Sequence, residues 1–105
     1  MDKLLLALLL MLCIIACNST QPLQQQVRKF QQSKDYQHLQ QIMALLPEKM
    51  DTSYVKKLLG EPIDMGFDYR YLTDSISPKG CAVGAVFHIN EYGQIDQRWL
   101  DEICE

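Results

Sequence analysis

The side chains of this chain best suited to chemistry are its four cysteines and two histidines. Cys81 and Cys104 form a pair in the carboxy-terminal part, and such a pair in an exported protein normally forms a disulfide. Free thiols are one alternative. A metal site is the other, but two cysteines without a CxxC or HxxxH partner are poor metal ligands. We therefore predict a Cys81–Cys104 disulfide that stabilises the fold by roughly 3 kcal/mol, and no metal.

Cys17 ends an apolar run, residues 4–16, which has the length of a signal-peptide core. It is shorter than the roughly 20 residues of a membrane span. The run ends in Ile14-Ile15-Ala16-Cys17, which resembles a bacterial lipobox. The alternative is a plain buried cysteine at the end of an apolar segment. The lipobox predicts a lipoprotein signal peptide over residues 1–16 and acyl chains, including palmitate, on Cys17. Two or more such chains anchor a protein stably in a membrane.

The expected location follows from this anchor. Cys13 would leave with the signal peptide, and Cys17 would become the first mature residue. Asn18 follows it, whereas an aspartate there resembles an inner-membrane retention signal of enterobacterial lipoproteins. We therefore expect a bacterial envelope protein that is lipid-anchored in the outer membrane and faces the periplasm.

Catalytic chemistry finds little support. Ser75 and Ser77 lack the GxSxG context of a nucleophile elbow. His88 and Asp96 form an acid–base pair in type, but no serine or cysteine nucleophile is expected beside them, and a cross-strand surface pair is the simpler interpretation. Two histidines this far apart do not indicate zinc. We predict that the chain is not an enzyme and uses no cofactor or small-molecule substrate.

The composition bounds the partners and the size. The 105 residues allow one small domain, and the net charge of −3 does not favour nucleic acid. Residues 17–34 are rich in glutamine and are predicted as a lipidated cysteine followed by a polar tether. Leu23, Val27 and Phe30 lie at helical spacing, so a helix is the open alternative. Residues 35–105 would form the domain.

Two helices should open that domain. Apolar residues recur at helical spacing over residues 35–46, Asp35 or Ser33 can cap the start, and Pro47 ends the pattern. A second, short helix is predicted over residues 51–60. Asp51 is its N-cap, and Gly60 suits the left-handed position that ends a helix.

Three strands follow, over residues 66–72, 81–89 and 94–100, with a loop at 73–80. A turn at 91–93 would place Ile89 opposite Ile95, and a regular ladder would then place Val86 opposite Arg98. This register brings Cys81 beside Ile103, so the chain must bulge or leave the ladder before Cys104. The predicted fold is α+β, with two amino-terminal helices packed on a three-stranded antiparallel sheet.

The alternation of side chains sorts the predicted strands into two faces. One carries most of the large apolar residues and should cover the helices; it consists of Phe67, Tyr69, Tyr71, Val83, Phe87, Ile89, Ile95 and Trp99. The other has a small, apolar centre with charges at its rims and could bind a partner. Its candidate residues are Asp68, Arg70, Gly84, Val86, His88 and Arg98. An ordinary solvated sheet face is the alternative.

Several motifs in residues 49–99 resemble one family of small lipoproteins. They are the capped helix MDTSYVKKLLGEP at 50–62, Tyr69-Arg70-Tyr71, Val86-Phe87, and the turn Tyr92-Gly93-Gln94-Ile95. This pattern is similar to the SmpA/OmlA (BamE-like) family of outer-membrane lipoproteins, whose fold is shared with β-lactamase inhibitor proteins. The resemblance implies helix-helix-β-β-β topology and a role in assembling outer-membrane proteins.

These expectations combine into two functional hypotheses. The first is a membrane-anchored envelope lipoprotein that binds one or more envelope proteins, as a scaffold or outer-membrane assembly accessory. The second is an inhibitor or immunity-type binder of a periplasmic enzyme. An acidic loop entering the target's cleft would favour it, and residues 73–80 are the candidate loop.

Overall fold

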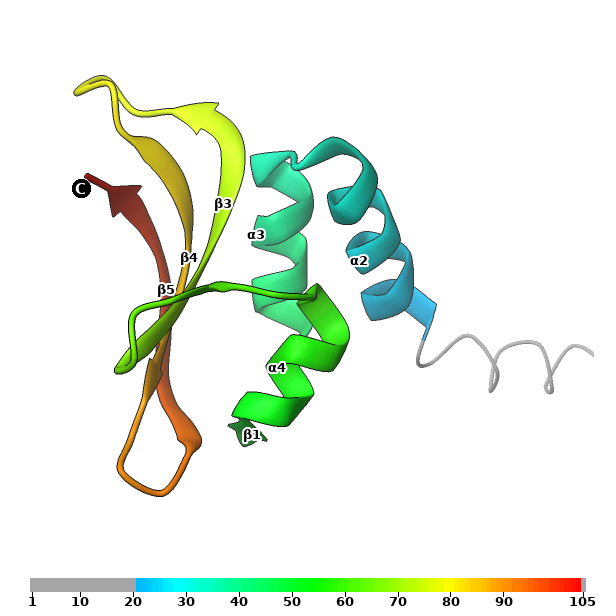
Figure 1. Ribbon diagram of the computed structural model, residues 1–105. Helices are drawn as coiled ribbons and strands as arrows, with labels where there is room; N and C mark the ends of the chain where they lie inside the picture. The colour runs from blue at the N-terminus through cyan, green and yellow to red at the C-terminus, as the bar shows by residue number, and fades with distance from the viewer. Residues whose placement is uncertain (1–20, 105) are drawn as a thin grey trace, which may run out of the picture.

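The computed structural model describes residues 21–104. Within them, three helices cover one face of a five-stranded antiparallel sheet (Figure 1). The sheet has the strand order β1-β5-β4-β3-β2. The elements are α2 (Gln21–Ser33), α3 (Tyr36–Leu45), β1 (Met50–Asp51), α4 (Thr52–Leu59), β2 (Ile63–Asp64), β3 (Asp68–Ile76), β4 (Ala82–Ile89) and β5 (Gln94–Ile103). The α+β class is confirmed. The expected two helices and three strands are incomplete, because α2 and the two-residue strands β1 and β2 were not predicted as such.

The helical alternative, and not the polar tether, describes residues 21–33. Val27 and Phe30 are 4% and 1% exposed, and Leu23 packs against the same core. These residues lie four and three positions apart, so they form one apolar stripe on a helix whose other positions are mostly glutamines. A short helix like this is marginal in isolation, so burial of the stripe against α3 and α4 is what stabilises it.

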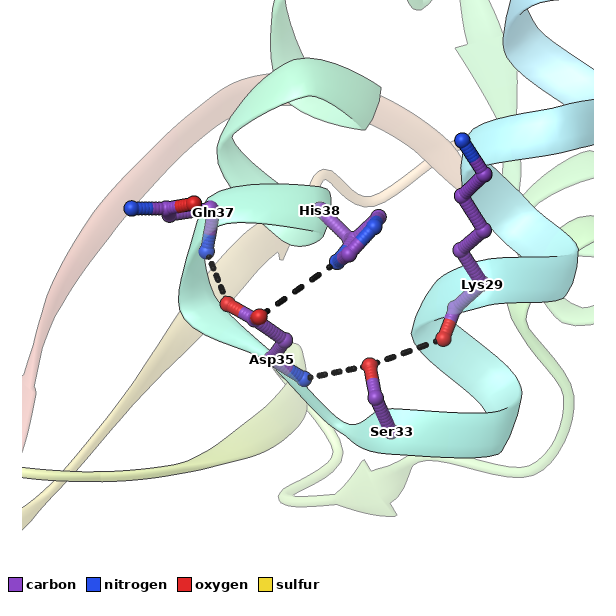
Figure 2. A network of polar contacts seen from close by, with 5 residues as sticks. All are labelled: Lys29, Ser33, Asp35, Gln37 and His38. Carbon is purple, nitrogen blue, oxygen red and sulfur yellow. Dashed lines mark hydrogen bonds and ion pairs between the residues drawn. The ribbon is translucent and has the colours of Figure 1, made fainter.

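A tight corner joins α2 to α3, and Figure 2 shows its polar contacts. The Ser33 hydroxyl donates to the Lys29 carbonyl at 2.8 Å and accepts from the Asp35 amide. Asp35 is the predicted N-cap of α3: its Oδ1 accepts from the Gln37 amide at 2.7 Å. His38 Nδ1 lies 3.6 Å from Asp35 Oδ2; the side chain is 28% exposed, but its Nδ1 atom is buried without a hydrogen bond.

The second predicted helix, α4, has the expected ends. Asp51 Oδ1 accepts from the Tyr54 amide at 2.8 Å. Gly60 has a φ of 88°, and its amide donates to the Lys56 carbonyl. Val55 is 1% exposed in the core, which also holds Met50, the residue that precedes the N-cap Asp51. This helix therefore begins and ends where its capping residues indicate.

The core lies between the helices and the inner face of the sheet. Phe87 and Ala85 are fully buried in its centre, and the Tyr71 ring meets the Phe87 ring edge-on at 5.8 Å. The Tyr71 hydroxyl donates to the Gly60 carbonyl at 2.8 Å, which connects β3 to the end of α4. Burial raises the pKa of the Tyr71 phenol above its usual range, because the phenolate would lose its hydration there.

The β4–β5 register begins as predicted and then shifts by one residue. Ile89 pairs with Ile95, but His88 pairs with Gln97 and Val86 with Trp99, so a bulge lies at Asp96. The bulge anticipated from the cysteine positions is therefore present, and it lies next to the turn. Every residue of β5 after it points to the opposite face from the one predicted.

Three side chains show this reversal. Arg98 was predicted on the face away from the helices, yet its guanidinium donates to the Leu46 and Pro47 carbonyls beyond the end of α3. Leu100, two residues further along β5, shares the side of Arg98 and packs against the core. Trp99, predicted for the core, is 39% exposed on the opposite face. The regular-ladder prediction was wrong here because a bulge has no simple composition signal.

The segment 73–80 also differs from its prediction. Strand β3 continues to Ile76, with Thr73 Oγ1 donating to the Val83 carbonyl at 2.7 Å. The connection to β4 is a short turn closed by a hydrogen bond from the Gly80 amide to the Ser77 carbonyl. The chain therefore has a hairpin where a protruding loop was expected.

Candidate functional site

The candidate site lies on the face of the sheet that points away from the helices, which we call the outer face. It is formed by alternate residues of the three long strands. From the strand pairings, Asp68 and Arg70 of β3, Val86 and His88 of β4, and Trp99 of β5 share this face. The helix layer covers only the inner face (Figure 1); of these residues Trp99 and His88 reach the surface, whereas Asp68 and Val86 are buried within the face.

An ion pair lies at the centre of the outer face. Arg70 Nε donates to Asp68 Oδ1 at 3.1 Å, and the two side chains are 19% and 8% exposed. The strand pairing sets Arg70 opposite Val86, which is 6% exposed. A buried carboxylate is costly unless a cation and hydrogen bonds compensate it. The pair is therefore held in one geometry and gives the face a fixed polar feature.

A shallow groove of about 190 Å³ runs over this pair toward the end of β5. Trp99 forms part of its wall and is the largest apolar side chain available to a partner there. The lining residues are Asp68, Arg70, Val86, Trp99, Asp101, Glu102, Ile103 and Cys104. An apolar surface between carboxylates suits a partner side chain with an aliphatic stem and a positive end.

The disulfide closes one end of the groove. Cys81 and Cys104 are bonded, with their Cα atoms 5.0 Å apart, as predicted. The bulge at Asp96 explains why: with the shifted register, Ala82 pairs with Ile103, and one step further Cys81 stands opposite Cys104. The bond ties the residue that follows β5 to the start of β4, which fixes the wall formed by Cys104.

Glu102 lies beside the disulfide, and its carboxylate and the two sulfur atoms are all within 4.8 Å of one another. Three such ligands could hold a soft metal only as thiolates. Both sulfurs are used by the disulfide, and Glu102 forms an ion pair with Lys79 at 3.5 Å. In this oxidised form the cluster is a cross-link with a neighbouring ion pair.

His88 and Asp96 are in contact at the other end of the face. Nδ1 and Oδ1 are 2.6 Å apart, with both side chains about 40% exposed. The bulge turns Asp96 toward His88 although Gln97 is the paired residue. In residues 21–104, no hydrogen bond joins a serine or a cysteine to His88, so the pair has the geometry of a surface contact.

The structure brings together only part of the predicted site. Asp68, Arg70 and Val86 line the groove, and His88 lies further along the same face. Gly84 is buried against the backbone of Tyr71 and Leu72 in β3, and Arg98 lies on the helix side. Cys17, the predicted lipidation site, is outside the described residues.

Trp99, Asp101 and Glu102 were missing from the prediction. The cysteines were a partial signal: a bulge anywhere between Ile95 and Cys104 sets Cys81 opposite Cys104, and one that lies before Trp99 also turns Trp99 outward. No helix within residues 21–104 has the length and apolar character needed to cross a bilayer. Comparison of the chain with protein-family models, curated proteins and solved structures gives no match.

Proposed function

We propose that this protein is a lipid-anchored envelope protein that binds another envelope protein through the groove of its outer face, as a scaffold or assembly accessory of the SmpA/OmlA type. The observation that carries the proposal is the groove itself. It combines an exposed Trp99 with an immobilised Asp68–Arg70 pair on a rigid sheet. Exposed tryptophans in partly desolvated, preformed sites are typical centres of protein interfaces.

Two further features support the cellular part of the proposal. The Cys81–Cys104 disulfide is typical of a protein that folds in an oxidising compartment such as the periplasm. The apolar segment 4–16 followed by Cys17 is the motif expected of a lipoprotein. Together they favour an anchored domain exposed to the periplasm.

The chemistry of the groove also describes the partner. Asp101 and Glu102 stand beside Trp99, and the described sheet carries more acidic than basic residues. We expect a partner segment with a lysine or arginine next to an apolar residue, because its charge would meet the carboxylates while its aliphatic part packs on the indole. The inhibitor hypothesis has less support, because its protruding loop is a short turn.

The test is site-specific crosslinking in intact envelopes. A photo-reactive residue at position 101 should capture a defined partner, and Trp99→Ala combined with it should abolish the adduct. Tyr92→Ala is the matched control, because Tyr92 is 79% exposed at the β4–β5 turn, away from the groove. An adduct that survives Trp99→Ala but disappears with Tyr92→Ala would refute the groove as the binding site.

The anchor needs a separate test by intact mass. The protein extracted from membranes should begin at Cys17 and carry a lipid-sized addition that Cys17→Ser removes. A chain with another start and no lipid would remove the envelope location from the proposal and leave a soluble binder.

A further inference from the structure

The helix layer and the sheet carry opposite charges. Residues 21–60 contain six Lys and Arg and three Asp and Glu, a net charge of +3. Residues 61–104 contain three Lys and Arg and eight Asp and Glu, a net charge of −5. Because α2, α3 and α4 lie on one side of the sheet (Figure 1), this difference along the sequence becomes a difference between two layers of the molecule.

None of the helices α2, α3 and α4 contains an aspartate or a glutamate. Their charged side chains are Arg28, Lys29, Lys56 and Lys57. The acidic residues of this region lie in the connections. Asp35 and Asp51 cap helices, and only Glu48 is not a cap. The surface of α2 and α4 is therefore cationic with neutral glutamines around the charges.

Three of these cations lie on the exposed side of the helix layer. Lys57 lines a groove of about 250 Å³ together with Gln24, in the first turn of α2. Arg28 is one helical turn after Gln24 and therefore lies on the same side of α2; Lys29 next to it is also exposed. Lys56 differs, because its ammonium lies over the Tyr69 ring at 5.2 Å, toward the sheet.

The start of α2 fixes how far this surface can be from the anchor. Only residues 18–20 separate Cys17 from Gln21, the first residue of α2. A chain of that length spans at most about 14 Å. If Cys17 carries the lipid, the first turn of α2 and the neighbouring Lys57 stay close to the headgroups. Basic residues at this distance are attracted to anionic lipids over about one Debye length.

We propose that the helix layer lies against an anionic phospholipid surface, with Arg28, Lys29 and Lys57 at the headgroup phosphates and the acidic outer face of the sheet turned away from the membrane. This inference rests on the proposed lipid anchor. It adds an orientation: the same charge separation that holds the helices to the membrane presents the groove at Trp99 to proteins in the periplasm.

The experiment uses the lipidated full-length protein in two kinds of vesicle, one of phosphatidylcholine and one containing phosphatidylglycerol. A membrane-impermeant amine reagent labels lysines, and mass spectrometry reads each site. We expect several-fold protection of Lys29 and Lys57 in the phosphatidylglycerol vesicles, lost in phosphatidylcholine and at high salt. Lys79 is the internal control: its side chain is 76% exposed between β3 and β4, and it should be labelled equally in all samples.

A second measurement uses Trp99, the only tryptophan of the chain. Energy transfer from Trp99 to an acceptor-labelled lipid should change on neutralising the surface with Arg28→Gln, Lys29→Gln and Lys57→Gln together, because the domain would lose its fixed orientation. Lys79→Gln is the matched control and should change nothing.

Three other outcomes would each contradict the proposed orientation, the lipid anchor or both. Equal labelling of Lys57 and Lys79 in both vesicles, with the protein still bound, overturns the orientation and leaves the anchor. Protection of Lys57 that requires a second protein assigns the helix surface to that protein instead. Failure of the protein to float with either vesicle overturns the anchor and the orientation together.

Discussion

At the scale of single residues, Gly84 is a glycine because the backbone of β3 leaves no room for a side chain at this position. A Cβ built there would lie 3.0 Å from Leu72 Cα and closer still to the Tyr71 carbonyl oxygen. These are backbone atoms of β3, which cannot move aside without separating the strands. The sequence suggested that the small residue contributes to a partner surface, whereas the structure shows that it permits the β3–β4 approach beneath that surface.

The first prediction follows from this contact. Gly84→Ala should lower the free energy of unfolding by about 1–3 kcal/mol, the usual cost of overpacking. Ala85→Gly is a poor control because it opens a cavity in the core. Gly80→Ala is better, since a Cβ at that position would meet nothing within 4 Å and only the φ of +85° is strained. Denaturant unfolding followed by circular dichroism measures both. A loss for Gly84→Ala no larger than the loss for Gly80→Ala would show that the strands adjust and that the close approach costs little.

Tyr71 supports a prediction about alkaline pH. Burial raises the pKa of its phenol in the folded state above the unfolded value of about 10. The folded state therefore binds the proton more tightly. The resulting stability is fully present below about pH 10 and is lost as the pH rises through and above that value.

Tyr71→Phe should accordingly have two effects. It should cost about 1 kcal/mol at neutral pH, because the hydrogen bond to the Gly60 carbonyl is lost. It should also flatten the decline of stability above pH 10, because one titrating phenol is gone. Tyr92→Phe, at the exposed turn, should stay within about 0.5 kcal/mol at neutral pH. An unchanged alkaline slope in Tyr71→Phe would mean that burial does not control this phenol.

At the scale of elements, the bulge at Asp96 couples β5 to the helices. It turns Arg98 inward, and the guanidinium then hydrogen-bonds the carbonyls of Leu46 and Pro47 after the last turn of α3. Carbonyl groups at a helix end have no partner inside the helix, and a cation there also interacts favourably with the helix dipole. Arg98 therefore acts as a side-chain cap supplied from a distant strand.

Arg98→Met keeps much of the aliphatic stem and removes the donors. We expect a loss of about 2 kcal/mol, because hydrogen bonds from charged groups contribute more than neutral ones. Arg28→Met on the exposed side of α2 makes the same chemical change and should cost less than about 0.5 kcal/mol. Thermal unfolding of the two variants gives the comparison, and similar melting temperatures would show that the Arg98 contacts contribute little.

The same elements show what could be predicted from the sequence. The starts of α3 and α4 were found because Asp35 and Asp51 are local signals whose partners lie two or three residues away. The inner face of β3 was found because Tyr69 and Tyr71 alternate with polar residues. The bulge was located only within a range, between the turn and Cys104, because no local pattern marks Asp96. Its position decides whether Arg98 reaches the carbonyls of Leu46 and Pro47, about fifty positions away. A long-range contact of this kind leaves no local pattern.

The part of the candidate site on β3 and β4 could be predicted from local alternation, whereas the part on β5 depends on the position of the bulge. Asp68, Arg70 and Val86 lie in the part of the β3–β4 ladder that pairs regularly, before the irregularity between Leu72 and Ile76, so their face followed from alternation. Trp99 comes after the bulge, and a shift of one residue moved it from the expected core to the outer face.

At the scale of the whole molecule, the disulfide matters because a small domain buries little apolar surface. Cys81 and Cys104 are 23 positions apart, and both lie at the end of the β4–β5 pair that is farther from the turn. β1 pairs only with Gln94 and Ile95, so the rest of β5 has only β4 as a strand partner among the described residues. The cross-link therefore fixes the end of the strand that would separate most easily.

Cys81→Ser with Cys104→Ser should lower the free energy of unfolding by roughly 3 kcal/mol, since the unfolded chain regains the entropy of the open loop. The loss should appear in part as local opening at Asp101–Ile103, with faster hydrogen exchange there than at Gln94–Ile95, which β1 still covers. Binding of the partner at the outer groove should weaken together with this local stability, because Cys104 and Glu102 form part of the groove's wall. Hydrogen exchange that rises uniformly along β5 would mean that the disulfide stabilises the domain only globally, and that the groove does not depend on it.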